Sequence, residues 1–418
     1  MSVIIVGAGI GGLTTALALH ARGIGCEIFE QSAEIQPLGV GINLLPHAVK
    51  VLSALALQDR LDGVAIRTKE LAYFNKHGQA IWRESRGLEA GYPWPQFSIH
   101  RGELQMILLA AVQTRLGAAC VHFGHRVAAV EETGAGRATV RFVDRDGAAL
   151  RAVEAEILIA ADGIHSAVRA QFVPGEGPPK WNGAVLWRAV TEDWTPFLSG
   201  RSMIMAGHQN QKFVCYPISR AAHDRGRARL NWIAELRVDP TSPWRREDWS
   251  RPGRIEEFLP AFASWRFDWL DVPALIRGAA VSYEYPMVDR DPLPRWQWGP
   301  VTLLGDAAHP MYPIGSNGAS QAILDAQALA ESIATLGATR DALAAYEALR
   351  RPATSAIVLA NRGNGPEQVM QLAEERAPNG FAHVHDVIPA AELDAIAARY
   401  KRLAGFDLAT LRASAPQS

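Results

Sequence analysis

Cysteine, net charge and long hydrophobic runs are all scarce in this sequence. Its three cysteines, Cys26, Cys120 and Cys215, are odd in number and form no CxxC pair, which favours a reducing compartment over a disulfide framework. The formal net charge of -1 removes any electrostatic argument for nucleic acid or an anionic membrane. No apolar run approaches the roughly 18 residues of a spanning helix, and no secretory signal precedes the strand that begins at Val3. We therefore expect a cytoplasmic protein that binds small molecules and has neither nucleic acid nor a membrane as partner.

Tryptophan is distributed unevenly along the 418 residues. All twelve tryptophans lie between Trp82 and Trp298, and ten of them lie between Trp181 and Trp298. Aromatic and β-branched residues favour sheet surfaces, so this part of the chain predicts strands. They are expected at Ala184–Val190, Ser202–Ala206, Phe213–Ile218, Leu230–Val238 and Val281–Met287, with a hairpin of Leu71–Phe74 and Gln79–Trp82.

The rest of the chain alternates short apolar strands with helical stretches, which is typical of α/β layers. We predict an α/β fold with a Rossmann-like cofactor domain formed by residues 1–70, 96–180 and 288–360. A mostly antiparallel substrate domain, residues 71–95 and 181–287, is inserted into it. Residues 361–418 should form a helical C-terminal segment, with helices at about Glu367–Glu375 and Ala390–Leu403.

The N-terminal residues predict a dinucleotide site. The strand Val3–Val6 leads into a glycine-rich turn and then a helix, Leu13–Arg22; the turn contains Gly7, Gly9, Gly11 and Gly12. Gly7 permits a tight turn, Gly9 lets the backbone approach a pyrophosphate, and Gly12 lets the helix pack on the strand. The start of the helix offers free N–H groups and a positive dipole end to phosphates.

An acid follows at the expected distance. A second strand, Cys26–Glu30, ends eighteen residues after Gly12, so Glu30 lies where a carboxylate hydrogen-bonds a ribose diol. Gln31 should then lie near the adenine. Strand, glycines, helix, second strand and acid occur in order, which favours a nucleotide site over a mere tight turn.

Two later segments also bring an acid to the end of a buried strand. In the first, Ile157–Ala161 leads to Asp162, which could alternatively only cap the following helix. In the second, Val301–Gly305 leads to Asp306, whose carboxylate can accept from a ribityl or ribose hydroxyl. A turn that contains Gly315, Asn317 and Gly318 then opens a helix, and the N–H groups of a helix start suit an anion.

With these motifs the chain resembles the single-component flavoprotein aromatic hydroxylases, the class A FAD-dependent monooxygenases, from Met1 to about Asn361. Three segments look most like the members that hydroxylate phenazine carboxylates; they are Pro37–Asn43, Ser98–Leu108 and Tyr285–Pro294. The resemblance implies that the dinucleotide is FAD.

The resemblance also implies roles for individual residues. Arg101 and Gln105, which share a helical face at i and i+4, would bind the FAD phosphate and ribose, although a solvated polar face is the alternative. Val127 would contact adenine through its backbone, and Gly41 would pass the flavin ring. The full cofactor set comprises Gly7, Gly9, Gly11, Gly12, Glu30, Gln31, Gly41, Arg101, Gln105, Val127, Asp162, Asp306, Gly315, Asn317 and Gly318.

The activity implied is hydroxylation of a planar aromatic substrate, fused-ring or carboxylated, with O2 and NAD(P)H through a flavin C4a-hydroperoxide. The chain has one nucleotide fingerprint, so NADH or NADPH should bind only transiently. The residues predicted to face the substrate are Trp187, Arg188, Tyr216, Met311, Tyr312 and Pro313. No metal site is expected. An FAD-dependent dehydrogenase without oxygen insertion and a non-catalytic protein on the same fold remain alternatives, and the sequence leaves monomer and homodimer open.

Overall fold

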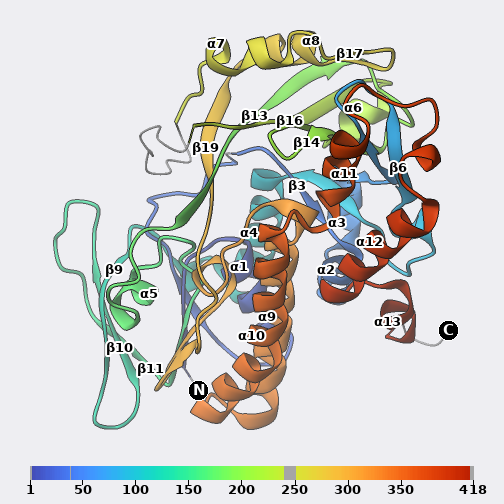
Figure 1. Cartoon of the computed structure of the whole chain (residues 1–418). Helices are drawn as coiled ribbons and strands as arrows, with labels where there is room; N and C mark the ends of the chain where they lie inside the picture. The colour runs from blue at the N-terminus through green and yellow to red at the C-terminus, as the bar shows by residue number, and fades with distance from the viewer. Residues whose placement is uncertain (1, 38, 240–250, 415–418) are drawn as a thin grey trace.

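The computed structural model describes residues 2–37, 39–239 and 251–414. Figure 1 shows two large β-sheet regions, one in the lower half of the view and one in the upper half, with the C-terminal helices alongside the upper one. The predicted α/β class is confirmed. Met1, Trp244 and Trp249, which contributed to the sequence argument, lie outside the described residues.

The lower sheet has six strands in the order β20-β21-β12-β1-β2-β8. All its neighbours run parallel except β20 and β21, as expected for a dinucleotide-binding sheet. The three central strands are entirely buried, which explains their continuous apolar sequences. The bounds are β1 (Val3–Val6), β2 (Glu27–Phe29), β8 (Val121–His122), β12 (Ile157–Ala160), β20 (Gln297–Trp298) and β21 (Val301–Leu303).

The helix after the glycine-rich turn lies at the centre of this half. It spans Ile10–His20 (α1), so it starts within the glycines, before the predicted Leu13, and ends before Gly23, whose φ of 72° is left-handed. It packs against α4 and α9. The other helices of this half are α2 (Pro46–Ala54), α3 (Gln58–Val64), α4 (Arg101–Leu116), α5 (Ala167–Phe172), α9 (Gly318–Leu336) and α10 (Arg340–Arg362).

The upper sheet has seven strands in the order β19-β13-β16-β15-β14-β5-β6. Every neighbouring pair is antiparallel except β14 and β5. All the strands predicted from the tryptophan-rich part and its hairpin belong to this one sheet. They are β5 (Glu70–Phe74), β6 (Ala80–Ser85), β13 (Lys180–Trp194), β14 (Ser202–His208), β15 (Gln211–Pro217), β16 (Ala228–Arg237) and β19 (Ser282–Asp289).

The two faces of the upper sheet bury different side chains because successive residues of a strand point to opposite faces. On the outer face, Trp187 stacks on Phe258 with ring centroids 4.9 Å apart, under α7 (Ile255–Phe258) and α8 (Val272–Arg277). On the inner face, Leu186 belongs to a second apolar cluster, which includes Met287 and residues of the C-terminal segment.

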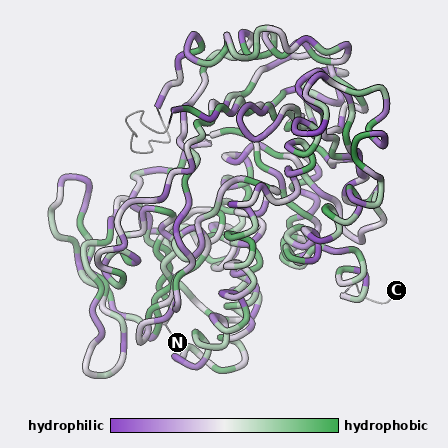
Figure 2. The backbone as a smooth tube through the Cα atoms, in the orientation of Figure 1, coloured by the Kyte–Doolittle hydropathy of each residue, from purple (hydrophilic) through white to green (hydrophobic). Residues whose placement is uncertain are grey.

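Smaller sheets complete the fold. A three-stranded antiparallel sheet comprises β9 (Arg126–Glu132), β10 (Ala138–Val143) and β11 (Val153–Ala155), and Figure 2 shows that its outer loop between β10 and β11 is hydrophilic at the tip. A second one, β3 (Gly41–Leu44), β7 (Phe97–His100) and β4 (Ile66–Arg67), lies where the chain passes between the two halves. The remaining elements are α6 (Arg220–Asp224), β17 (Arg266–Phe267) and β18 (Leu270–Asp271).

The C-terminal segment contains the two expected helices and a third. They are α11 (Gln368–Arg376), α12 (Ala390–Leu403) and α13 (Leu408–Ala413). Their buried faces join the inner-face cluster of the upper sheet and a small cluster around Tyr400 and Phe406. The segment is therefore packed onto the body of the protein.

Candidate functional site

The glycine-rich turn has the geometry that its sequence predicts. A Cβ on Gly7 would lie 2.4 Å from Ala161 O, and one on Gly12 would lie 2.0 Å from Gly7 O, so both positions demand glycine. A Cβ on Gly9 would meet nothing within 4 Å, and Gly9 and Gly11 both line a cavity. Gly7 and Gly12 are thus closely packed, whereas the space beside Gly9 is open. A pyrophosphate can therefore lie next to Gly9 at the start of α1.

Glu30 lies directly behind this turn. Its carboxylate accepts from the backbone N–H of Ala8 at 2.8 Å and from that of Ser32 at 2.9 Å. Gln31 beside it is exposed, and Val127 is buried at the start of β9, two residues after His125, whose N–H donates to Glu30 O. The three residues predicted to contact the adenosine half thus lie along the ends of β2 and β9.

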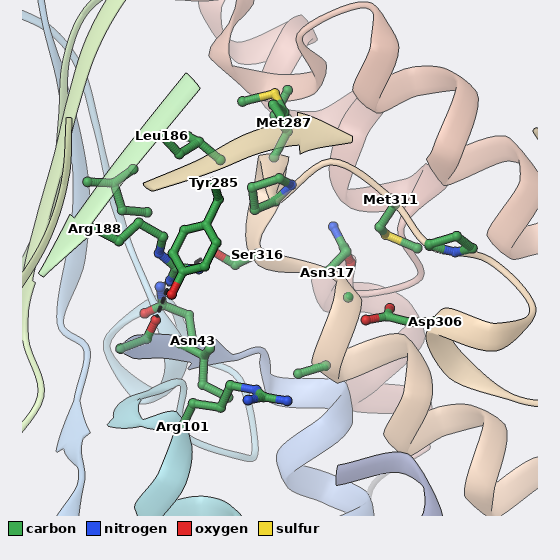
Figure 3. Close-up of a pocket in the computed structure, with 18 of the residues that line it drawn as sticks. Asn43, Arg101, Leu186, Arg188, Tyr285, Met287, Asp306, Met311, Ser316 and Asn317 are labelled. Carbon is green, nitrogen blue, oxygen red and sulfur yellow. Dashed lines mark hydrogen bonds between the residues drawn. The ribbon is translucent and has the colours of Figure 1, made fainter. Parts of the chain in front are cut away.

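Arg101 and Gln105, which share one face of α4, make different contacts. The amide of Gln105 donates to Ala8 O at 2.8 Å, which ties α4 to the glycine-rich turn. The Arg101 side chain extends into the cavity from the start of α4 (Figure 3). Its guanidinium remains available for an anion, whereas Gln105 acts on the backbone that would contact the phosphates.

Asp162 follows β12, two residues after the strand ends at Ala160. One carboxylate oxygen is 3.4 Å from the N–H of Val168, and the other is buried with no hydrogen-bond partner among the described residues. Burial raises the pKa of this carboxyl. Ser166 is the N-cap of α5 and accepts from the Arg169 N–H, while Asp162 accepts from an N–H of the same first turn. Asp162 thus contributes to capping through one oxygen, and its other oxygen is left for a ligand.

Arg169 was not singled out from the sequence as a site residue, yet it connects two of the motifs. It is buried, pairs with Glu176, and donates to the carbonyl oxygens of Ala307 and Ala308 at 3.0 and 2.9 Å. Those two residues directly follow Asp306 in the chain. A buried cation with fixed donors therefore holds the two acid-bearing loops together.

Asp306 and His309 lie close in sequence but in different environments. Asp306 is not at a strand end as expected: β21 ends at Leu303, and Asp306 lies in a short 3-10 turn, Gly305–Ala307. Its carboxylate is exposed on the cavity wall, and desolvation there raises its pKa against the opposing effects of His309 and Arg101. His309 is buried and pairs with Asp325 at 2.5 Å.

The turn before α9 is contacted by Tyr400 of the C-terminal segment. Gly315 has a φ of 67°, and a Cβ there would lie 2.1 Å from the Tyr400 hydroxyl. Asn317 donates to that hydroxyl at 2.8 Å. A Cβ on Gly318 would meet nothing within 4 Å, so the start of α9 faces open cavity space.

These elements surround one cavity of about 330 Å³. Figure 3 shows its walls: Asp306, Met311 and Asn317 on one side, Arg188 and Tyr285 on the other, and Leu186 and Met287 above. The cavity extends from the glycine-rich turn to the inner face of the upper sheet. Most of its lining is apolar side chains and backbone, with a few polar groups, as in small-molecule sites.

Gly41 lines the cavity and is hydrogen-bonded to side chains of the upper sheet. Its carbonyl oxygen accepts from Arg188 Nη2 and from the Tyr216 hydroxyl, both at 2.8 Å, and its N–H donates to Asn231 at 2.7 Å. A Cβ at this position would lie 2.6 Å from Asn231 Cβ, so packing against the sheet requires glycine here. Burial raises the pKa of Tyr216 to about 12, which keeps the phenol a donor at neutral pH.

The structure brings four of the six predicted substrate-side residues to the cavity: Arg188, Tyr216, Met311 and Pro313. Trp187 points to the outer face of the sheet instead, because it alternates with Leu186 and Arg188 along β13. Tyr312 is buried in the inner-face cluster beside the cavity without lining it. Residues that the sequence did not single out also line the cavity, notably Asn43, Lys212, Glu235, Tyr285, Ser316 and Glu367.

The site fits FAD by its own geometry. The backbone at Gly9 is open to a phosphate, the Asp306 carboxylate lines the cavity, and an unpartnered buried oxygen remains on Asp162. The Glu30 carboxylate lies behind the glycine-rich turn and bonds its backbone. The start of α9 offers backbone N–H groups to the same space. The described residues contain no group of three or more His, Cys, Asp or Glu side chains arranged to hold a metal ion.

Comparison with known proteins agrees with this geometry. Residues 1–361 match the family model described as FAD binding domain, and the chain belongs to this family. It is 49% identical over 362 residues to the phenazine 1,6-dicarboxylic acid hydroxylase of Lysobacter antibioticus, covering 86% of this chain and 89% of that protein. It is 33% identical over 376 residues to a 3-amino-4-hydroxybenzoate 2-monooxygenase of Streptomyces platensis, covering 87% and 88%.

A solved structure supports the fold. HpxO of Klebsiella pneumoniae, in complex with FAD and uric acid, superposes with a TM-score of 0.73 at 24% identity, covering 100% of this chain and 97% of that one. The predictions of FAD as cofactor and of an FAD-dependent aromatic monooxygenase are confirmed by the family and its members. Among the described helices, none has the length and apolar character needed to cross a bilayer.

Proposed function

We propose that this monooxygenase hydroxylates a fused-ring aromatic carboxylic acid of the phenazine type, with O2 and NADH or NADPH as transient co-substrates. The observation that carries the proposal is Arg188, whose guanidinium lines the cavity and keeps a buried Nε without a partner among the described residues. Both curated relatives reported above are named for aromatic acids. A guanidinium can bind a carboxylate through two parallel hydrogen bonds.

The residues divide the work as follows. FAD, when bound, supplies the redox chemistry with NAD(P)H and O2. The glycine-rich turn, Glu30, Asp162, Arg101 and Asp306 would hold its phosphates and sugar hydroxyls. The Asn317–Gly318 backbone at the start of α9 would stabilise negative charge on the ring system.

The chain also positions the substrate and excludes water. Arg188 would anchor the carboxylate, while the neutral Tyr216 phenol can donate to a polar group beside it. Apolar side chains on the cavity walls, Leu186, Val214, Ile233 and Met287, would keep the reacting edge dry. No nucleophilic side chain is required for this reaction.

A direct experiment tests the activity. The purified protein should be yellow, and a panel of phenazine, quinoline and benzene carboxylic acids should stimulate NAD(P)H oxidation with matching O2 uptake and a hydroxylated product. Flavin reduction without O2 uptake or product would indicate the dehydrogenase alternative. A colourless protein that does not bind added FAD would indicate the non-catalytic one.

Arg188→Met tests the anchor. The KM for a carboxylated substrate should rise roughly ten- to a hundredfold, the equivalent of about 1.5–3 kcal/mol for a charged hydrogen bond. The corresponding carboxamide should be affected much less in the same variant. Equal effects on the acid and the amide would contradict the assignment.

We also propose a domain organisation and a cellular location for this chain. Residues 1–70, 96–180 and 288–360 would form the cofactor domain, residues 71–95 and 181–287 the substrate domain, and residues 361–418 a segment that completes both. A cytoplasmic location is supported by three free thiols at Cys26, Cys120 and Cys215. Both a monomer and a homodimer are compatible with the proposed activity.

A further inference from the structure

A charged triad lies on the inner face of the upper sheet, where it lines the cavity. Lys212 Nζ on β15 is 2.7 Å from Glu235 Oε2 on β16 and 2.5 Å from Glu367 Oε2. All three side chains are more than nine-tenths buried, with 7%, 7% and 6% of their surface exposed. Glu367 comes from the C-terminal segment and lies past residue 361, where the family match ends.

The triad lies at the far end of the cavity from Gly41. Strand register arranges the floor in three successive pairs: Tyr216 with Asn231, Val214 with Ile233, and Lys212 with Glu235. The first pair contacts Gly41 through both side chains. Lys212 is four residues from Tyr216 along β15, which at about 3.3 Å per residue places it roughly 13 Å away. An elongated flat molecule that lies along the floor would reach from one end to the other.

The two ends of the cavity have opposite electrostatic character. Arg101 and Arg188 line the end near Gly41. At the far end, one ammonium is shared between two carboxylates, so the triad has no excess of positive charge. Burial raises the pKa of Glu235 against the effect of Lys212, and the two carboxylates hold the pKa of Lys212 above its usual value although burial opposes them.

The triad retains capacity to accept hydrogen bonds. Each carboxylate pairs with Lys212 through one oxygen, Oε2, and both Glu235 and Glu367 line the cavity. A carboxylate has a second oxygen that can accept from a donor on a ligand. A third carboxylate brought to this end would be repelled in a low-dielectric setting with no free cation to offset it.

We propose that Lys212, Glu235 and Glu367 read the far edge of the substrate, selecting a hydrogen-bond donor or cationic group there and rejecting a carboxylate. The inference rests on the proposed function, because it assumes an aromatic acid anchored by Arg188. The preferred substrate is then an elongated aromatic monoacid with an amino, hydroxyl or ring N–H group on the edge opposite its carboxylate.

The test compares three ligands that differ only at the far edge: a phenazine monocarboxylic acid, its analogue with an amino group on the distal ring, and phenazine 1,6-dicarboxylic acid. Binding to the FAD-loaded enzyme is measured by perturbation of the flavin spectrum, and turnover by O2 uptake. The wild-type enzyme should bind the analogue with the distal amino group at least tenfold more tightly than the diacid. Equal or tighter binding of the diacid would overturn the inference without any variant.

Variants then locate the selectivity. Glu235→Gln and Glu367→Gln should each reduce the preference for the amino analogue over the diacid by about tenfold. The matched control is Glu84→Gln, which removes a buried carboxylate that pairs with Lys401 of the C-terminal segment away from the cavity. This control should retain the wild-type preference. A purely structural triad would lower the unfolding temperature in the Gln variants and leave the ratio of affinities unchanged, which would contradict the inference.

The outcomes separate the two proposals. If none of the aromatic acids perturbs the flavin or stimulates O2 uptake, the proposed function fails. If they bind and are hydroxylated, but wild type and both variants share the same ratio, only the role of the triad fails.

Discussion

The Tyr400 hydroxyl, on α12, accepts a hydrogen bond from Asn317 Nδ2 at 2.8 Å, and so joins the C-terminal segment to the start of α9. The same hydroxyl lies 2.8 Å from Asn361 Oδ1 and 3.3 Å from Ile314 O. Tyr400 is buried, and it fills the space that a side chain at Gly315 would need. The turn proposed to face the flavin is thus shaped partly by a residue some eighty positions away.

Tyr400→Phe should therefore loosen the flavin turn. Loss of the hydroxyl leaves Asn317 and Asn361 short of a partner, at a cost of about 1–3 kcal/mol. We expect FAD to dissociate about tenfold more readily, measured by fluorescence of released flavin on dilution. Tyr92→Phe is the control, because its buried hydroxyl bonds Phe406 O in the same segment. If both variants lose flavin equally, Tyr400 only stabilises the fold.

Asp306→Ala and His309→Ala should have different effects, the first on FAD affinity and the second on stability. Asp306 opens onto the cavity, so its loss should weaken FAD binding by roughly ten- to a hundredfold, as for a charged hydrogen bond. His309 pairs with the buried Asp325, so its removal should mainly lower the unfolding temperature. Flavin titration and thermal unfolding of both variants distinguish the two effects. Equal losses of flavin at equal stability would contradict this division.

Glu30→Ala should also weaken FAD binding. The carboxylate now holds the N–H groups of Ala8 and Ser32, so the variant would lose both the order of the turn and the proposed contact with the ribose. A decrease of about ten- to a hundredfold in affinity is expected. Full flavin occupancy after dilution to nanomolar protein would show that Glu30 does not bind the cofactor.

FAD should be bound without a covalent link. The residues that line the cavity in the described structure include neither cysteine nor histidine, the usual points of attachment. Acid precipitation should therefore release all yellow colour to the supernatant. Colour that stays with the pellet would refute the expectation.

Acidification should destabilise the protein partly through His47 on α2. Burial lowers the pKa of His47 from 6.5 to about 3, and the charge on Arg350 adds to the effect. Between these values the unfolded chain binds a proton that the folded protein excludes, so stability is full above pH 6.5 and declines as the pH falls towards 3. One such proton corresponds to about 1.4 kcal/mol per pH unit.

His47→Gln should reduce that slope while retaining a polar group near Gln321, which lies 3.4 Å from the imidazole. Denaturant unfolding of both proteins at pH 7, 6 and 5, with saturating FAD, measures the difference. The wild-type protein should lose stability faster on acidification than the variant. Identical slopes would mean that His47 is protonated in the folded state at mild acidity.

Local motifs were predictable because their physical requirements are local. The turn at Gly7, Gly9 and Gly12 depends on backbone geometry and on close contacts within a short stretch, so the residue types alone indicated it. The strands of the upper sheet were predicted from their apolar and aromatic content, and each was found within a few residues of its expected bounds. The resemblance carried by these motifs extended the interpretation to FAD.

The face that each side chain presents was decided by the tertiary structure. Trp187 and Arg188 are adjacent, and only the orientation of β13 in the sheet sends one towards α7 and the other into the cavity. Tyr312 and Met311 are divided in the same way. A shift of one residue along a strand moves each side chain to the opposite face of the sheet, and amino-acid composition does not specify which face a side chain takes.

By itself, the sequence determined the dinucleotide site and the fold class, because glycine spacing and the strand–turn–helix order satisfy constraints that operate over a few residues. The family resemblance carried by the same motifs extended this to FAD and to the kind of reaction. The tertiary structure alone decided what lies around the substrate. Lys212, Glu235 and Glu367 come from β15, β16 and the C-terminal segment, and nothing in their local sequence marks them. They meet because the two strands pair in register and the segment packs over the inner face of the sheet, and both contacts depend on burial of apolar surface far apart in the chain.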